Sequence, residues 1–303
     1  MYKDEIKQTY SNIELFQLFM KQKAILLFLL QEEILAIDQP IASLMNKYKY
    51  DSFHYPLFYF PEIKPFEHKR RLHDLQKEVP ENLEEIRKIG ENDSELCKII
   101  RKDSVEEFIA YINITKTKLD EKIDPSINET NHFLIKNKPE LIEYAAFYGS
   151  IEIIKYLQSQ NIELKPSLWL YSIHSNKIEM IQFLEENKVE PEDKTYEKCL
   201  KESVKCHHND IANYIKEKYV KEEEVNYFKG KRFNVNVLIV YAFYYYNYNY
   251  FPKGLHNHFC MSYLCQYDYY ELIELLLKMK KINVNVDVVL LYFFLELTIK
   301  YVL

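Results

Sequence analysis

Glycine is scarce in this sequence, which contains only Gly90, Gly149, Gly230 and Gly254. Loops that cradle phosphates, and the tight strand-to-helix turns of nucleotide-binding α/β folds, depend on closely spaced glycines. The scarcity therefore argues against a nucleotide-binding fold, and no cofactor is expected.

Cysteine is also sparse, with five in 303 residues. An odd number of cysteines in a long chain favours free thiols in a reducing compartment, so we expect a cytoplasmic protein. The first residues, M-Y-K-D-E-I-K-Q-T-Y, lack the apolar core and small-residue cleavage site of a secretory signal.

Long apolar runs and a strong charge bias are missing as well. The run at 24–30 is far shorter than the roughly 20 residues that a membrane span needs. The C-terminal segment 286–303 is long enough, but Asp287, Glu296 and Lys300 interrupt it at high cost in lipid. We interpret both runs as core-facing, with membrane contact by 286–303 kept as the alternative. The net charge of -6 gives no reason to expect nucleic acid or an anionic membrane as a partner.

Residues 1–92 predict an N-terminal helical region. Ser11 is a candidate N-cap, and Glu14 three residues later has the spacing of a capping box. Prolines then break the chain between 40 and 65, around the aromatic run F-H-Y-P-L-F-Y-F-P. Proline at this density excludes a long helix or a central strand, so the run predicts a packed loop.

From residue 93 the chain becomes periodic. The stretch L-I-E-Y-A-A-F-Y-G-S-I-E-I-I-K-Y-L at 141–157 aligns without gaps with four other stretches, at 96–112, 168–184, 199–215 and 260–276. Each reads as two short helices around a turn, and the predicted turn formers are Gly149, Asn176 and Asp268. Such short helices are unstable alone, whereas stacked pairs share a continuous core. Residues 93–285 therefore predict an all-α helical solenoid.

The copy at 145–157 resembles the ankyrin repeat, whose run A-A-x-x-G-H-x-E-I-V-x-L-L it matches almost position for position. Stretches such as I-R-K-D-S-V-E-E-F-I and C-H-H-N-D-I-A-N-Y-I are similar to the divergent ankyrin proteins expanded in trichomonad protists, a family without assigned function. The likeness covers about residues 80–285. The T-P-L-H opening of the ankyrin repeat is missing, and copies begin as little as 27 residues apart, against the usual 33.

The resemblance implies protein recognition on the concave face of the array. In the ankyrin family the two residues before the turn usually face that groove. When these two positions are transferred to the copies in this sequence, the predicted contact residues are Phe147, Tyr148, His174, Ser175, Lys205, Cys206, Gln266 and Tyr267. They vary between copies while the apolar frame persists, as expected of a binding array.

Two groups of residue types that commonly bind metals lie within the repeat region. Cys206, His207 and His208 accompany Cys199, and a second group comprises His256, His258, Cys260 and Cys265. Neither has the close C-x-x-C pairs of a structural zinc site. In the repeat frame, Cys199 and Cys260 occupy the position of Leu141, where a small buried hydrophobe fits. We therefore predict core cysteines and no metal, and we find no catalytic residues.

Residues 235–251 fill the place of a missing repeat, with Ala242 as the small position. Their V-L-I-V run would also suit a strand. The tyrosines between 244 and 250 are of a type that stacks bases or forms an interface, but no Arg or Lys is interleaved, so packing with exposed hydroxyl tips is favoured.

The function expected is a non-enzymatic protein–protein interaction module for an unknown protein partner. Two alternatives stay open. One is an enzyme with its catalytic region in residues 1–90 and the array as its targeting arm. The other is a degenerate family member that has lost its partner. The oligomeric state is not predicted.

Overall fold

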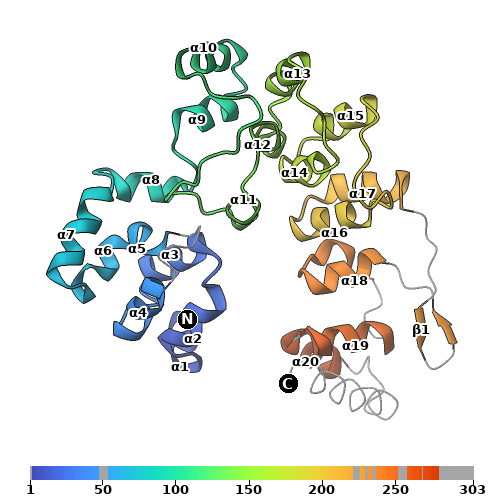
Figure 1. The fold of residues 1–303 in the computed structure, drawn as a ribbon. Coiled ribbons are helices and arrows are strands. Elements are labelled where there is room, and N and C mark those ends of the chain that lie inside the picture. Colours follow the sequence, from blue (N-terminus) through green and yellow to red (C-terminus); the bar gives the residue numbers. More distant parts are fainter. Residues whose placement is uncertain are drawn as a thin grey trace. The chain divides into compact units, whose positions relative to one another are not determined.

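The computed structural model describes residues 2–47, 54–220, 226–228, 231–233, 237–251, 258–267 and 269–279. These residues form a predominantly helical protein, in agreement with the predicted all-α class (Figure 1). The described part departs from that class at one antiparallel hairpin, β1 (Asn226–Phe228) and β2 (Lys231–Phe233). The predicted C-terminal segment 286–303, the predicted turn former Asp268, and His256 lie outside the described residues.

The chain divides into two compact units, Met1–Glu163 (unit 1) and Leu164–Leu303 (unit 2). The division falls within the predicted repeat region and not at residue 92. Among the described residues, no helix is both long enough and apolar enough to cross a membrane. Each unit has a hydrophobic core of its own.

Unit 1 begins with eight helices and a 3-10 turn: α1 (Tyr2–Thr9), α2 (Asn12–Phe19), α3 (Lys23–Gln31), α4 (Gln39–Lys47), α5 (Tyr55–Phe58), α6 (Phe60–Ile63), η1 (Lys64–Phe66), α7 (Lys69–Glu78) and α8 (Leu83–Ile89). The predicted capping box is present at α2. The amide N of Glu14 donates to Ser11 Oγ over 3.4 Å, and the amide N of Ser11 donates to the Glu14 carboxylate over 2.8 Å.

The proline- and aromatic-rich stretch is not a loop, as the sequence suggested, but consists largely of the short helices α4, α5, α6 and η1. Prolines occupy first-turn positions of α5 and α6, where their missing N–H is not needed. The rings of Tyr55 and Tyr59 stack with centroids 5.9 Å apart, and Phe58 meets Tyr59 edge-on. All three are buried with Phe16 in the core of this region, which holds these short helices in place.

The rest of unit 1 contains α9 (Glu95–Lys102), α10 (Val105–Thr115), α11 (His132–Asn137), α12 (Leu141–Tyr148) and α13 (Ile151–Ser159). Gly149 caps α12 in the left-handed conformation with φ 67°, as its place in the repeat predicted. Helix α12 packs on α9, and α13 packs on α10, so first helices meet first helices and second helices meet second helices.

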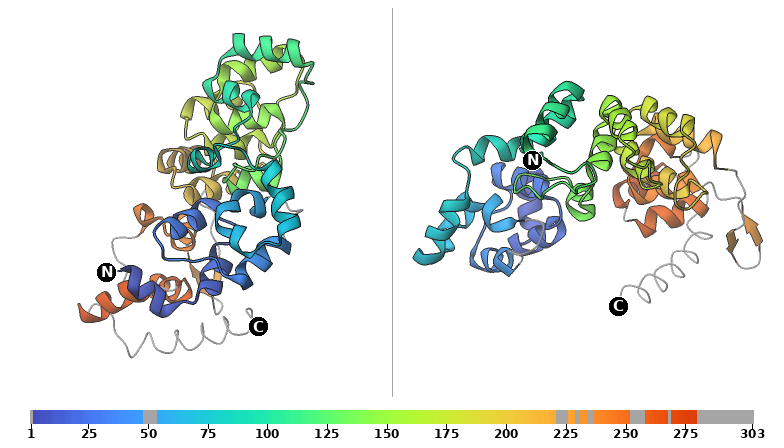
Figure 2. Two further views of the ribbon diagram at one scale, coloured as in Figure 1. Left: turned by 90° about the vertical axis from the view of Figure 1, so that its left-hand side faces the viewer. Right: turned by 45° about the horizontal axis from the view of Figure 1, so that its top comes forward.

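Unit 2 contains α14 (Leu168–His174), α15 (Ile178–Glu186), α16 (Glu197–Lys205), α17 (Asn209–Lys218), α18 (Val237–Tyr244), η2 (Tyr248–Tyr250), α19 (His258–Gln266) and α20 (Tyr270–Lys278). Its helix pairs follow one another in Figures 1 and 2, and α16 contacts both α14 and α18, while α18 contacts α19. Left-handed residues end the first helices at Asn176, His207 and Tyr246.

The V-L-I-V run belongs to helix α18 and not to a strand. Packing decides this choice, because Ala242 and Phe243 have no exposed surface and Phe243 lies in a core with Cys260 and Leu264. Tyr246 follows Ala242 by four residues, just as Gly149 follows Ala145. The left-handed φ of 55° at Tyr246 therefore places a repeat-like turn in the irregular segment.

Candidate functional site

The predicted contact residues of unit 1 are largely covered. Phe147 is 8% exposed, and its ring stacks on that of Phe133 with a centroid distance of 6.2 Å. Phe133 belongs to α11 and lies in residues 115–136, the insertion between the first two copies. Tyr148 is half-buried beside Tyr144, and the Arg101 guanidinium carbon lies 5.6 Å from its ring centre. Phe147 is thus a core residue, because the insertion supplies an aromatic ring that covers it.

The predicted contact residues of unit 2 lie at the ends of the first helices. His174 and Ser175 end α14, Lys205 and Cys206 end α16, and Gln266 and Tyr267 end α19. Lys205 and Gln266 are exposed and the others are half-buried. Because neighbouring helices in the series α14, α16, α18 and α19 contact one another, we call their C-terminal ends and the following turns the helix-end edge of unit 2.

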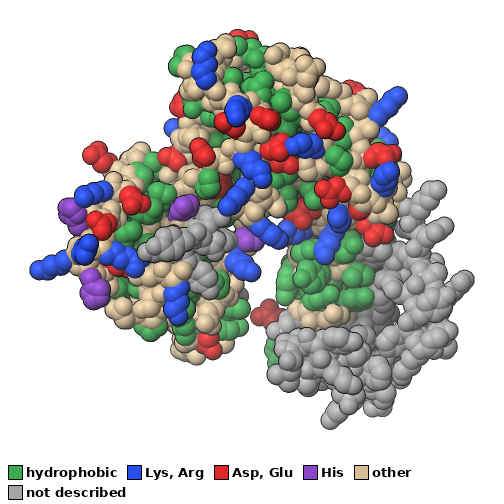
Figure 3. All heavy atoms as spheres, viewed as in Figure 1, with side chains coloured by type: hydrophobic (Ala, Val, Ile, Leu, Met, Phe, Trp, Pro, Cys, Tyr) green, Lys and Arg blue, Asp and Glu red, His purple; other side chains and the backbone are tan. Residues whose placement is uncertain are grey.

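The end of helix α18 and the residues that follow it add tyrosines to this edge. Tyr244, Tyr246 and Tyr248 are 50%, 48% and 63% exposed. The Lys201 ammonium lies 5.9 Å from the ring centres of Tyr241 and Tyr244. Figure 3 shows hydrophobic side chains, a class that includes tyrosine, gathered over α18. The predicted packing with exposed hydroxyl tips therefore describes only part of the run, since three of its rings are about half exposed.

A thiol, an imidazole and a carboxylate meet on the helix-end edge. Cys206 Sγ lies 3.6 Å from His174 Nδ1, and His174 Nε2 lies 3.1 Å from Glu202 Oε1. One ligand atom from each residue lies within 4.8 Å of the other two. Lys205 Nζ also donates to Glu202 Oε1 over 2.8 Å.

The cluster differs from the cysteine and histidine group found in the sequence. Cys199 is fully buried in the core, as its repeat position predicted. His207 occupies the left-handed turn with φ 59°, and one of its ring nitrogens lies 3.2 Å from the Tyr245 carbonyl. His208 Nδ1 lies 2.7 Å from the Ile173 carbonyl. The second sequence group is only partly described, with Cys260 buried and Cys265 half-buried.

Burial and hydrogen bonding set the charges of the cluster. Burial acts to raise the pKa of Glu202, but hydrogen bonds from His174 and Lys205 outweigh it and lower the pKa below its ordinary value. Burial raises the pKa of the Cys206 thiol to about 12, and the Glu202 charge adds to that effect. The free thiol is therefore protonated at neutral pH, which is unfavourable for a cysteine nucleophile.

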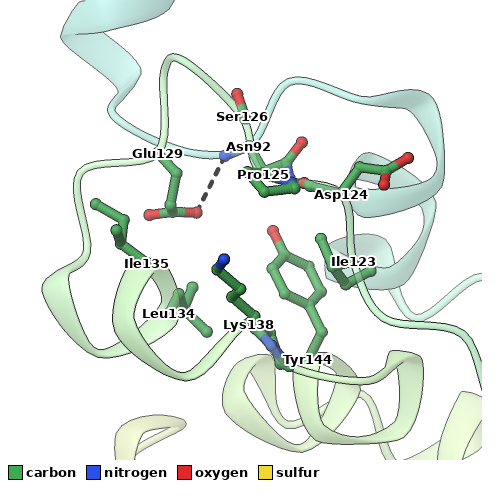
Figure 4. A pocket seen from close by; sticks show the side chains of 11 residues that line it. Asn92, Ile123, Asp124, Pro125, Ser126, Glu129, Leu134, Ile135, Lys138 and Tyr144 are labelled. Carbon is green, nitrogen blue, oxygen red and sulfur yellow. Dashed lines mark hydrogen bonds between the residues drawn. The ribbon is translucent and has the colours of Figure 1, made fainter. Parts of the chain in front are cut away.

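Unit 1 contains a small cavity of about 30 Å³ that is lined by both polar and apolar side chains (Figure 4). The Glu129 carboxylate points into it and accepts hydrogen bonds from the amides of Asn92, at 3.3 Å, and Asn131, at 2.8 Å. Burial raises the pKa of Glu129 in spite of these bonds. A volume of this size holds about one water molecule, so it does not accommodate an organic substrate.

The Lys23 ammonium is fully buried in unit 1. It donates to the carbonyl oxygens of Ile127, at 2.9 Å, and Glu129, at 3.0 Å, and lies 4.8 Å from the Phe58 ring centre. Burial lowers the pKa of Lys23 to about 7. Both donated bonds go to backbone carbonyls across the fold, so Lys23 attaches the 127–129 segment to α3.

The chain matches no protein-family model, no curated protein and no solved structure in the three comparisons made.

Proposed function

We propose that this protein is a non-enzymatic protein-binding module, built as a divergent ankyrin-like array of helix pairs. The proposal is supported by the packing of first helices on first helices within each unit. It is also supported by left-handed turns at equivalent positions of successive copies, at Gly149, Asn176, His207 and Tyr246. Regularly repeated helix pairs present their turns along one edge, where side chains vary without disturbing the core.

The observation that carries the proposal is the composition of the helix-end edge in unit 2. Tyr244 is half exposed, Lys205 and Gln266 are exposed, and Tyr267 packs edge-on against Tyr244 with ring centres 5.2 Å apart. Tyrosine is enriched in protein interfaces because it offers a large contact area at a small entropic cost. The edge therefore combines tyrosine anchors with variable polar groups.

The binding surface proposed here is narrower than the one inferred from the sequence. It comprises His174, Ser175, Lys205, Gln266 and Tyr267, with Tyr244 added. Phe147 is left out because its ring lies in the core of unit 1. Replacement of Phe147 by alanine would remove buried contacts, so it would report on stability more than on partner binding.

An enzyme site in residues 1–90 has less support. Lys23 donates to backbone carbonyls, and Glu129 accepts from backbone amides beside a cavity with room for one water. An open hollow of about 470 Å³ within residues 1–90, whose lining includes Lys7, Glu33 and Glu62, contains neither of these groups. A catalytic site needs a concave space in which substrate and reactive groups meet. A protein-binding role needs no such space.

The test is partner capture with matched variants. Full-length wild-type protein, the triple variant Lys205→Ala/Tyr244→Ala/Tyr267→Ala, and the control Tyr10→Ala are used as baits in native lysate. Tyr10 is 44% exposed and lies in unit 1, so the control removes a tyrosine of similar exposure elsewhere. A protein retained by wild type and control but not by the triple variant is then purified, and its Kd for each bait is measured directly.

We expect the triple variant to bind the purified partner at least tenfold more weakly, about 1.4 kcal/mol, with the control unchanged. Equal affinity for all three baits would contradict this choice of surface. Far-UV circular dichroism and thermal unfolding of each bait establish that weaker binding is not a result of unfolding.

A further inference from the structure

The side chains of His174, Glu202 and Cys206 represent the three ligand types that zinc binds in proteins. Imidazole nitrogen, thiolate sulfur and carboxylate oxygen coordinate zinc at about 2.0–2.3 Å, and three protein ligands with one further position are common for this ion. We propose that these three residues form a binding site for one zinc ion in unit 2.

The spacing of the nitrogen and sulfur fits this ion. A tetrahedral centre with Zn–N of about 2.0 Å and Zn–S of about 2.3 Å places the two ligand atoms about 3.5 Å apart. His174 Nδ1 and Cys206 Sγ are 3.6 Å apart. One edge of the coordination tetrahedron is therefore already formed by the histidine and cysteine side chains.

The carboxylate lies within reach of the same point. A Glu202 oxygen, a ring nitrogen of His174 and Cys206 Sγ lie within 4.8 Å of one another. Glu202 Oε1 contacts the other ring nitrogen of His174, Nε2, at 3.1 Å, so metal binding through Nδ1 requires the glutamate side chain to rotate toward Cys206. Water completes the coordination, because three protein ligands converge here among the residues that the structure describes.

The repeat architecture accounts for this meeting of ligands. Glu202 and Cys206 are four residues apart at the end of α16, a separation that places side chains on one face of a helix. Helix α14 packs against α16 and ends at His174. Stacking of two consecutive copies therefore brings a histidine from one copy to the glutamate and cysteine of the next.

Lys205 is the cation that now neutralises Glu202. Its ammonium is 2.8 Å from the carboxylate, and its side chain is 45% exposed. Because Lys205 reaches Glu202 from the solvent side, we expect a divalent ion bound by three side chains to displace its ammonium. The His174 and Glu202 side chains are 11% and 15% exposed, which leaves the cluster near the surface.

Zinc bound here would link α14 to α16 and stabilise unit 2. Trp169 lies in α14 and is the single tryptophan of the chain, so its fluorescence reports on this unit. A ligand that binds only the folded state raises the unfolding temperature according to its concentration and affinity. Metal binding and partner binding are separate properties, so failure of this inference leaves the proposed function standing.

The experiment uses full-length protein freed of metal with a chelator and then titrated with Zn²⁺ alone. We expect one zinc per chain by equilibrium dialysis and a rise in the unfolding temperature detected by Trp169 fluorescence. Titration with Co²⁺ in place of zinc should produce the intense near-ultraviolet absorption of a cobalt–thiolate bond.

Variants identify the ligands. Cys206→Ser should abolish the cobalt–thiolate absorption, and Cys206→Ser and His174→Gln should each weaken zinc binding at least tenfold. Glu202→Gln, which keeps the size of the side chain, should weaken it in the same direction and serves if the other two fail to fold. The controls Cys265→Ser and His207→Gln remove a half-buried cysteine and an exposed histidine of unit 2 outside the cluster, and should bind as wild type does.

Three results would overturn the proposal. The first is the absence of stoichiometric zinc from the wild-type protein at micromolar metal. The second is a cobalt complex without thiolate absorption. The third is loss of binding in the control variants with retention in the cluster variants, which would place the ion elsewhere.

Discussion

The two units use polar side chains in opposite ways. In unit 1 the charged groups Lys23, Arg87 and Glu129 are at most 5% exposed. Lys23 and Arg87 hydrogen-bond to residues far away in sequence. In unit 2 the corresponding groups, Lys205, Glu202 and His174, lie at helix ends, where they contact each other and retain some exposure.

This difference in the use of polar side chains follows from the segments that each unit contains. Unit 1 contains the proline-rich short helices and the 115–136 insertion, neither of which belongs to a repeat. Buried ionic side chains attach these segments to neighbouring helices, so their bonding capacity is used within the fold. Unit 2 has more regular helix pairs that pack through apolar faces, and the polar groups of its helix-end edge contact one another near the surface. The buried charged groups of unit 1 therefore have structural roles, whereas we propose binding roles for the partly exposed groups on the helix-end edge of unit 2.

Removal of Arg87 should have the largest effect. Arg87 is 5% exposed and bonds Glu62 with both terminal nitrogens, at 2.9 and 2.8 Å, and also Glu84. Arg87→Met leaves Glu62, itself 20% exposed, without its partner, so we expect a loss of about 3 kcal/mol in free energy of unfolding. Urea unfolding followed by far-UV circular dichroism measures the loss, with the exposed Arg70→Met as control.

The same variant tests whether the units unfold independently. Trp169 lies in unit 2. Because Arg87 lies in unit 1, we expect Arg87→Met to shift the circular dichroism transition of unit 1 and to leave the tryptophan fluorescence transition unchanged. A fluorescence midpoint that moves by the same amount would mean that the two units unfold as one.

Lys23 should give unit 1 a distinctive pH dependence. Its pKa is about 7 in the folded protein, below its ordinary 10.5, because burial disfavours the charged form. Between these values the unfolded chain binds a proton that the folded chain does not, so this group makes stability rise with pH across that range. Lys23→Met should remove a slope of at most about 1.4 kcal/mol per pH unit.

The measurement is the difference in unfolding free energy between wild type and Lys23→Met from pH 7 to pH 10, so that other titrating groups cancel. The exposed Lys21→Met, two residues away, is the matched control and should leave the wild-type slope intact. Parallel curves for wild type and Lys23→Met would show that Lys23 titrates normally.

Asn247 offers a smaller test in unit 2. It is fully buried, and its Nδ2 donates to the Val204 carbonyl at 3.0 Å and to Asn209 Oδ1 at 2.8 Å. Asn247→Ala leaves both acceptors without this donor, so we expect a loss of about 1–3 kcal/mol. The loss should be detected by Trp169 fluorescence, and a shift confined to circular dichroism would contradict the assignment of Asn247 to the unit 2 core.

Local features of the fold were predictable from sequence. Ser11 with Glu14, and Gly149 between two apolar faces, specify helix ends through interactions within a few residues. The short helices around Tyr55 and Phe58 were predicted as a loop, because only burial against a distant helix such as α2 stabilises them. Their helical state depends on tertiary packing and leaves no local signal.

The candidate site was predictable only in part. The position of Cys199 in the core followed from its alignment with Leu141, and the left-handed turn at Asn176 followed from its alignment with Gly149. The cluster of His174, Glu202 and Cys206 was missed because its members come from consecutive copies, about 30 residues apart, and meet only when α14 packs on α16. Burial of Phe147 was missed because the partner ring, Phe133, belongs to an insertion outside the repeat frame.

The smallest stability effect is expected at Tyr244. This variant is also the most direct test of the difference between the two units. Tyr244→Ala removes a half-exposed ring, so the unfolding free energy should change by no more than about 0.5 kcal/mol. Tyr144→Ala in unit 1 removes a ring that is 1% exposed and whose hydroxyl lies 2.7 Å from Arg101, and should cost about 3 kcal/mol or more. If the two variants lose similar stability, Tyr244 is a structural residue and the helix-end edge is not a surface set aside for binding. A small loss of stability in Tyr244→Ala, together with weaker partner binding by the same variant, would separate the roles of the two units. A tyrosine would then support folding in unit 1 and recognition in unit 2.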